Sequence, residues 1–205
     1  MSSSFCMIYT LMIYIFDYQF RRYSCISTKQ EFYSFVFVYS KMSALRGFVV
    51  PVHKHSNAIH AYTDASIRQG KAGIGFYSPA KKYAARVNEP RDINRAELGA
   101  IFAGIYLTEQ DLDILIFSDS QNALNSITAY KRTKYDKLAK FVFELAAERS
   151  GNVFVAKVKA HSGVPGNEAA DRLAAAGRSK PEEFVLPDEF SSLEEWRKYI
   201  DIRKT

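Results

Sequence analysis

Four carboxylates along the chain stand in settings that suit the binding of divalent cations: Asp64, Glu97, Asp119 and Asp171. Carboxylates that converge on one spot repel one another unless cations lie between them. Mg²⁺ is a hard ion that prefers oxygen ligands, and two such ions roughly 4 Å apart can activate a water molecule and stabilise a departing oxygen. No cysteine or histidine cluster accompanies these acids, so zinc is not expected. The pattern therefore predicts metal-dependent hydrolysis of a phosphodiester.

Two of these acids are expected at the ends of strands. Asp64 follows the alternating residues 58–63, and Asp119 follows the apolar residues 112–117. Both runs have the composition and period of β-strands. Because open α/β sheets bind ligands beyond the carboxyl ends of their strands, we expect the two side chains to meet at one edge of a sheet.

The other two acids are expected on helices. Glu97 falls in the first two turns of a helix for which Asp92 is a suitable N-cap. Asp171 falls in a helix that opens near residues 166–168, and it comes ten residues after His161 in the segment HSGVPGNEAAD. Taken singly, each acid is as well explained by a turn, a helix cap or a solvated helix face. Only their joint occurrence favours a shared site.

The order of the expected elements predicts an α/β fold with a mixed five-stranded sheet. Strands are expected at residues 58–64, 72–78, 82–87, 112–118 and 152–158, and helices at 93–108, 120–128, 135–149 and 167–178. The first three strands should form an antiparallel meander, with turns at 68–71 and 78–81. The crossovers after them make the remaining pairings parallel, with helices on both faces of the sheet.

Four pieces of sequence around the acids are distinctive: YTDAS (62–66), NRAELGAI (94–101), FSDSQNAL (117–124) and VKAHSGVPGNEAADRLA (158–174). One short piece alone would be a weak signal, whereas four in this order and spacing are specific. Together they make residues 58–180 resemble the type 1 ribonucleases H. The resemblance implies a ribonuclease H-like fold for this segment.

The resemblance also implies an activity. It would be endonucleolytic hydrolysis of the RNA strand of RNA/DNA hybrids with two Mg²⁺ ions, for which Mn²⁺ can substitute, leaving 5′-phosphate and 3′-hydroxyl ends. It implies that Asp64 bridges both ions, that Glu97 and Asp119 hold one, and that Asp171 helps to hold the other. His161 matches the family's mobile histidine, which assists proton transfer or product release. Histidine suits either role because it exchanges protons near neutral pH.

Several residues near the acids match the family's contacts with the hybrid. Asn94 matches an asparagine that touches the minor groove, where 2′-hydroxyls distinguish RNA from DNA. Ile93 departs from the family, because many members have a second asparagine there. Ser120 has an alternative interpretation as the cap of the next helix. The candidate substrate contacts close to the acids are Ser66, Asn94, Ser120, Gln121 and Asn167.

The segment between the third acid and the histidine is shorter than in many relatives, which insert a helix and a basic loop that grip the DNA strand. In its place this chain has only a short segment, residues 131–140, in which five residues are lysine or arginine. We expect three of them to make the remaining phosphate contacts. The alternative is a solvated turn before a helix. The three candidates are Lys131, Arg132 and Lys134.

The charge distribution is compatible with a polyanionic partner. The chain of 205 residues carries a formal charge of +6. Residues 58–180 hold 18 basic against 13 acidic side chains, whereas residues 181–205 hold 4 against 7. The excess of positive charge therefore lies in the segment that carries the four acids.

Two other classes of function fit the sequence less well. A protein that only binds hybrids would normally have lost one of the four acids, and none is missing. A different nuclease of the same superfold would not be expected to carry HSGVPGNEAAD. The alternative left open is a hybrid-binding protein or a domesticated retroelement domain, with weak or partner-dependent activity.

Residues 1–57 are expected to be an extension outside the catalytic domain. The apolar run 5–16 is too short to span a bilayer, and it is followed, not preceded, by Arg21 and Arg22. The sequence favours two interpretations equally: a targeting segment, or an upstream sequence that precedes a functional start at Met42. It favours a membrane anchor less. We expect an intracellular protein, located in the nucleus and cytoplasm or in the mitochondrion, without stable membrane insertion.

Residues 181–205 are expected to form a tail with a short amphipathic helix. Its apolar residues recur at helical spacing. They predict docking on the chain's own domain, with docking on a partner as the alternative. No obligatory protein partner is indicated, and a monomer is expected. The apolar residues are Leu193, Trp196, Tyr199 and Ile200.

Overall fold

The computed structural model describes residues 36–39, 57–88, 92–128 and 134–203. Within them, seven strands form one sheet in the order β1-β6-β5-β2-β3-β4-β7. The strands are β1 (Val36–Tyr39), β2 (Ile59–Arg68), β3 (Lys71–Tyr77), β4 (Lys82–Val87), β5 (Ile114–Ser118), β6 (Val153–Lys157) and β7 (Glu183–Phe184). The helices are α2 (Ile93–Leu107), α3 (Gln121–Thr128), α4 (Asp136–Glu148), α5 (Pro165–Gly177), the 3-10 helix η3 (Pro187–Glu189) and α6 (Leu193–Ile202).

The centre of the sheet has the predicted topology. β2, β3 and β4 form an antiparallel meander, while β5 pairs parallel to both β2 and β6. The first turn places Gln69 and Gly70 at φ 51° and 71°, the left-handed pair that a two-residue hairpin turn requires. The second turn is closed by backbone hydrogen bonds between Ser78 and Lys81. Both turns lie where the sequence predicted them.

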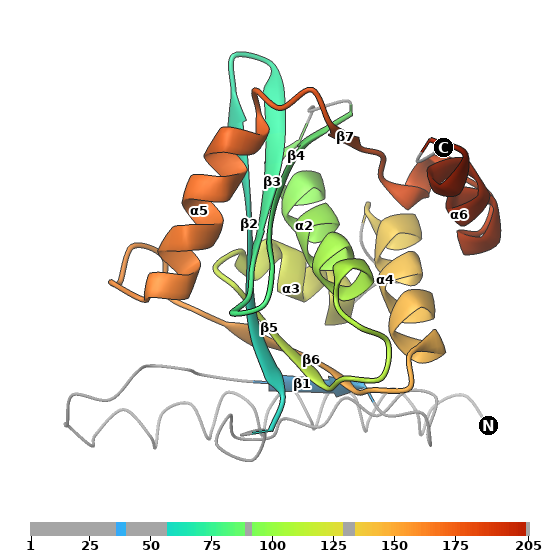
Figure 1. Cartoon of the computed structure of the whole chain (residues 1–205), viewed down its shortest axis with the longest axis horizontal. Coiled ribbons are helices and arrows are strands. Elements are labelled where there is room, and N and C mark those ends of the chain that lie inside the picture. The colour runs from blue at the N-terminus through green and yellow to red at the C-terminus, as the bar shows by residue number, and fades with distance from the viewer. Residues whose placement is uncertain (1–35, 40–56, 89–91, 129–133, 204–205) are drawn as a thin grey trace, which may run out of the picture. The chain divides into compact units, whose positions relative to one another are not determined.

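Helices cover both faces of the sheet, as Figure 1 shows. Alternate residues of β5 point to opposite faces, so Ile114 and Ile116 join the larger core and Leu115 and Phe117 join a smaller one. The larger core lies under α2, α3 and α4, and α5 packs on β2, β3 and β4 across the other face. The prediction of an α/β fold with a mixed sheet between helices is confirmed.

Two short edge strands extend the sheet beyond the five that the sequence predicted. β1 lies within the segment assigned to an extension, and its backbone pairs antiparallel with β6. β7 lies in the tail and pairs parallel with β4. These strands have four and two residues, too few for a periodic pattern to identify them.

The expectation that Asp64 ends its strand is wrong. β2 continues to Arg68, because Asp64 and the residues after it keep pairing with β3 as far as the hairpin. The parallel partner β5, by contrast, ends at the pair Thr63 and Ser118. Asp64 therefore lies in mid-strand, at the level where pairing on one side of β2 stops. Asp119 directly follows β5, as predicted, so the two acids are still level.

Glycines in β3 allow α5 to lie directly on the sheet. A Cβ atom at Gly75 would lie 2.2 Å from the carbonyl oxygen of Ala170, and one at Gly73 would lie 2.4 Å from that of Ala174. These oxygens belong to the helix backbone, which cannot yield unless the helix moves. Because Gly75 pairs with Asp64, the helix that carries the fourth acid is held over the strand that carries the first.

Arg149 organises the loop that leads into β5. Its side chain is buried, and burial lowers the pKa of its guanidinium group. The charge is met by backbone carbonyl oxygens, which accept four hydrogen bonds of 2.5–3.0 Å. This contact fixes where β5 begins, and so where its other end delivers Asp119. The four acceptors are Ile105, Thr108, Glu109 and Leu112.

The tail packs against the rest of the domain. Trp196 of α6 is fully buried, and its ring lies edge-on to those of Phe102 and Tyr106 at centroid distances of 5.0 and 4.9 Å. Its indole Nε1 donates to the carbonyl oxygen of Val185 at 2.8 Å. The apolar face of the predicted amphipathic helix thus docks on the chain's own domain. Among the described residues, no helix has both the length and the apolar character needed to cross a bilayer.

We predict that Gly75→Ala destabilises the domain by about 2–3 kcal/mol, at the upper end of the cost of overpacking, because the clash is with backbone. It should also lower activity, since α5 must shift away from β2. Chemical denaturation measures the first effect and a nuclease assay the second. Unchanged values for both would contradict the close packing described here.

Candidate active site

Three of the four predicted acids come together. One carboxylate oxygen from each of Asp64, Glu97 and Asp119 lies within 4.8 Å of the others. They come from mid-strand β2, from the second turn of α2 and from the residue after β5. Asp64 and Glu97 are each only 7% exposed, and Asp119 is half-buried. The molecule therefore concentrates three acidic groups in a largely water-excluded spot.

Local interactions explain how α2 and β5 deliver their acids. Asp92 is the predicted N-cap of α2, and its carboxylate accepts a hydrogen bond from the backbone N–H of Asn94 at 2.9 Å. Ser118 is the last residue of β5, and its hydroxyl accepts one from the backbone N–H of Ser120 at 3.1 Å. These contacts fix the start of the helix that carries Glu97 and the turn that carries Asp119.

Burial and crowding disfavour the charged forms of these acids. Burial, the charge of Asp119 and, to a smaller extent, that of Asp171 raise the pKa of Asp64 to about 7. Burial, followed by the charges of Asp64 and Asp119, raises the pKa of Glu97 well above its ordinary value. A divalent cation placed among such groups reverses this effect by stabilising their charged forms.

The donor set fits a hard cation. All three ligand candidates are carboxylates, and the Oε2 atom of Glu97 is buried with no hydrogen-bond partner among the described residues. Buried acceptors rarely remain unpaired unless an ion or a water molecule meets them. Oxygen ligands suit Mg²⁺, Mn²⁺ or Ca²⁺ rather than zinc. The three acids can therefore hold a divalent metal ion.

Asp171 stands beside this group but is not one of the three. It is half-buried on α5, and its charge contributes to the raised pKa of Asp64. The helix backbone that carries it rests on β3. It is thus close enough to act electrostatically on the first acid, as expected for an outer member of the site.

Asn167, predicted as a substrate contact, touches one of the acids. It is 3% exposed, and its Nδ2 donates to the Oδ2 of Asp119 at 3.2 Å. Its Oδ1 atom is buried without a hydrogen-bond partner in the part of the chain that the structure describes. The amide therefore orients Asp119 and offers one further acceptor to whatever enters the site.

Lys157 was not predicted and also reaches the site. It is the last residue of β6, paired with Ser118, and its ammonium group donates to the backbone carbonyl oxygen of Asp119. Burial lowers its pKa, although the charges of Asp119 and Glu97 act in the opposite direction. The only signal for Lys157 in the sequence was that a charged residue ends an apolar strand. In the structure Lys157 places a cation beside the acids.

Comparisons with known proteins agree with this geometry. The RNase H family profile matches residues 56–179, which include all four acids and His161. This chain belongs to the RNase H family. It is similar to the ribonuclease H of Methylococcus capsulatus, with 29% identity over 137 residues, 58% of this chain and 88% of that protein. It also resembles the crystal structure of RNase H1 from the halophilic archaeon Halobacterium salinarum NRC-1, with a TM-score of 0.51 and 22% identity over 58% of this chain and 96% of that one.

The family assignment makes the protein a ribonuclease H, a hydrolase, and the acidic cluster agrees with the divalent metal that the family uses. The structural likeness, at 22% identity, supports the fold. The predicted family and enzyme class are confirmed. The roles of individual residues remain predictions.

His161 of this ribonuclease H is exposed in the loop between β6 and α5. Its backbone adopts φ 50°, a left-handed conformation that is uncommon for residues other than glycine. Gly163 follows at φ 78°, and the Ser162 hydroxyl donates to the carbonyl oxygen of Lys159 at 2.6 Å. The loop is thus a tight turn that presents the imidazole to solvent.

The predicted substrate contacts near α2 and α3 have protein partners. Asn94 accepts a hydrogen bond through Oδ1 from the Nδ2 of Asn122 at 3.0 Å, which fixes the orientation of its amide. Gln121 is exposed and donates to Asn125 within α3. Ser120 caps α3 by accepting from the backbone N–H of Ala123 at 3.2 Å, as its alternative interpretation predicted. Asn122 was missed because nothing in its local sequence marks it.

Two further residues that were predicted to contact the substrate instead pair with other residues of the protein. The hydroxyl of Ser66 accepts a hydrogen bond from Arg178 at the end of α5. Lys134 has an exposed ammonium group that pairs with the carboxylate of Asp92 at 2.6 Å. Lys131 and Arg132 lie outside the described residues. A lysine engaged with a helix cap is a less direct phosphate contact than the sequence suggested.

We predict that the stability of the metal-free protein falls as the pH rises. The pKa of Asp64 is raised from 3.8 to about 7, so its carboxyl group favours the folded state fully below about pH 4 and loses this contribution as the pH rises through about 7. Added Mg²⁺ should restore stability at about pH 8 by occupying the acids. Thermal unfolding in EDTA and in Mg²⁺ measures both effects.

Asp64→Asn should be more stable than the wild type in EDTA at about pH 8 and should gain less from Mg²⁺, because one repelling charge is gone. Glu144→Gln, which removes a surface carboxylate paired with Lys140, is the control. Equal pH dependence and equal Mg²⁺ response in all three proteins would refute the assigned electrostatics.

Proposed function

We propose that this protein cleaves the RNA strand of RNA/DNA hybrids endonucleolytically, with two Mg²⁺ ions and products that carry 5′-phosphate and 3′-hydroxyl ends. The observation that carries the proposal is the convergence of Asp64, Glu97 and Asp119 within 4.8 Å inside the segment that matches the RNase H family. The name of the Methylococcus relative, ribonuclease H, supports the same substrate.

In this proposal the acids hold the cations. Asp64 has a carboxylate oxygen within 4.8 Å of Glu97 and Asp119 and also feels the charge of Asp171, so it is the residue suited to serve both ions. When bound, such cations lower the pKa of a coordinated water and stabilise charge on the phosphate and the leaving oxygen. Asn167 keeps Asp119 in place through its 3.2 Å hydrogen bond.

His161 moves a proton in the proposed reaction. Its side chain is exposed on a tight turn next to α5, which carries Asp171. An imidazole in that position can donate a proton to the leaving 3′-oxygen or assist release of the product. Because the acids do not depend on it, its loss should slow turnover without abolishing it.

Recognition of the RNA strand is assigned to the pair formed by Asn94 and Asn122. Asn122 donates to Oδ1 of Asn94, and the side chain of Asn94 also hydrogen-bonds Tyr135, so protein contacts orient this amide. Its Nδ2 carries two N–H groups and can therefore still offer a donor to the substrate. A donor at this position can meet a 2′-hydroxyl or a base acceptor in the minor groove. Ile93 beside it is 41% exposed and offers an apolar surface where many relatives have asparagine.

The proposal is tested by incubating the full chain with labelled RNA/DNA hybrid, double-stranded RNA, double-stranded DNA and single strands, with Mg²⁺ or EDTA. Cleavage is expected only in the RNA of the hybrid and only with metal. End-labelling of the products tests the predicted 5′-phosphate. Cleavage of DNA alone would instead identify a different nuclease, and binding without cleavage would favour the hybrid-binding alternative.

We predict that Asp64→Asn reduces the rate of hybrid cleavage by at least about 10³-fold, since it removes the ligand shared by both ions, while the affinity for hybrid changes little. His161→Ala should reduce the rate by about 10²-fold, the range for loss of one acid–base group. Single-turnover kinetics and a binding assay in Ca²⁺ measure these effects. Glu144→Gln is again the control. Full activity of Asp64→Asn, or loss of its binding, would contradict the assigned role.

A further inference from the structure

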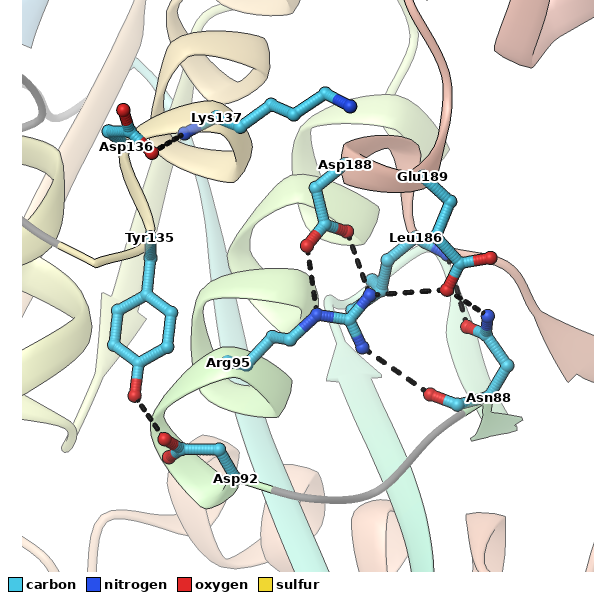
Figure 2. Close-up of polar contacts among 9 residues, drawn as sticks. All are labelled: Asn88, Asp92, Arg95, Tyr135, Asp136, Lys137, Leu186, Asp188 and Glu189. Carbon is cyan, nitrogen blue, oxygen red and sulfur yellow. Dashed lines mark hydrogen bonds and ion pairs between the residues drawn. The ribbon is translucent and has the colours of Figure 1, made fainter.

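An ionic cluster joins the tail to the first turn of α2. The guanidinium group of Arg95 donates to both carboxylate oxygens of Asp188 in η3 at 2.9 Å, which is the bidentate geometry of a strong ion pair. It also donates to Glu189 at 3.3 Å and to the carbonyl oxygen of Asn88 at 3.5 Å. Figure 2 shows these groups converging on Arg95.

The cluster is partly shielded from water and internally connected. The side chains of Arg95 and Asp188 are only 18% and 19% exposed. Asn88 links its members, because its Nδ2 donates to Glu189 and its Oδ1 accepts from the backbone N–H of Leu186 at 3.4 Å. The arrangement thus holds the Arg95 side chain in one orientation.

The tail follows the same face of α2 away from the cluster. Leu186 packs so closely on Gly99 that a Cβ atom there would lie 2.5 Å from its side chain. Trp196 then contacts Phe102 and Tyr106 further along the helix. Arg95, Gly99, Phe102 and Tyr106 are spaced by four, three and four residues, which is one face of a helix.

The first turn of α2 is also held from the other side. Asp92, its N-cap, accepts a hydrogen bond from the hydroxyl of Tyr135, the N-cap of α4 (Figure 2). It accepts another from Lys134, which precedes Tyr135. These donors lower the pKa of Asp92 to about 2. Asn94 and Glu97 therefore belong to a helix start that is clamped by α4 on one side and by the tail on the other.

We propose that Asp188 and Glu189 are positioning residues for the active site, which act through Arg95 to set the first turn of α2 and thereby the placement of Glu97 and Asn94. The inference rests on the proposed function for its catalytic consequence. The two acids lie beyond residue 179, where the match to the RNase H family ends. The tail is thus a part of this chain's active-site support that the family match does not include.

The test uses the full chain with Asp188→Asn, Glu189→Gln and the double substitution, which remove charge and keep shape. Asp188→Glu is the rescue variant, because it restores a carboxylate to Arg95. Glu148→Gln is the matched control: it breaks the ion pair between α4 and Arg197 of the tail without touching α2. All assays are run well below the unfolding temperature, with folding checked by circular dichroism.

For the double variant we expect kcat/KM for the hybrid to fall by about ten- to a hundredfold, the effect of misplacing catalytic groups by about 1 Å. The Mg²⁺ concentration for half-maximal rate should rise, since Glu97 is displaced. Compared with Asp188→Asn, Asp188→Glu should have a kcat/KM and a Mg²⁺ requirement close to those of the wild type. Glu148→Gln should match the wild type in both. A double variant with wild-type KM and Mg²⁺ requirement, altered only in unfolding temperature, would show a purely structural role and overturn the proposal.

A second readout separates this proposal from the proposed function. The affinity of each variant for the hybrid in Ca²⁺, and the Mg²⁺ concentration that gives half of the thermal stabilisation, do not require cleavage. If the wild type binds hybrid but cleaves nothing, the proposed activity fails. The positioning role then stands if the double variant binds hybrid about tenfold more weakly, and it fails if binding and metal response are unchanged.

Discussion

The crowding of two buried carboxylates and a half-buried one is the constraint on which the rest of this structure depends. The charge of Asp119 raises the cost of charging both Asp64 and Glu97, and the charge of Asp64 adds to that cost for Glu97. The fold holds them together from three separate elements. Bound cations would offset this cost by stabilising the charged carboxylates, so affinity for metal and instability without metal have the same origin.

The three acids are held in place by different kinds of contact. The strand that carries Asp64 is fixed by backbone hydrogen bonds to β3, and Asp119 is placed by the end of β5 and by the amide of Asn167. Glu97 sits on a helix, which can slide or tilt as a rigid body. Its position depends on packing against β2, β3 and α4 and, at its first turn, on polar side-chain contacts from the start of α4 and from the tail.

The sequence predicted those features that are encoded locally. The N-cap Asp92, the turn at residues 68–71 and the apolar strand before Asp119 each carry their signal within a few residues, and each prediction is confirmed. The sequence misjudged Asp64, because the end of its alternating pattern coincides with the loss of one neighbouring strand and not with the end of β2. Lys157 and Asn122 were missed because only the tertiary fold brings them to the site.

The bond between Arg95 and Asp188 joins residues 93 positions apart, one inside the segment that matches the family and one beyond its end. Contacts of such separation form late, since a long loop must close before they can be made. During synthesis the chain emerges from its N-terminus, so α2 is complete well before η3 and Trp196 are available. In a nascent chain Glu97 would then stand on a helix that the tail does not yet hold, so full order at the acidic cluster becomes one of the last events of folding.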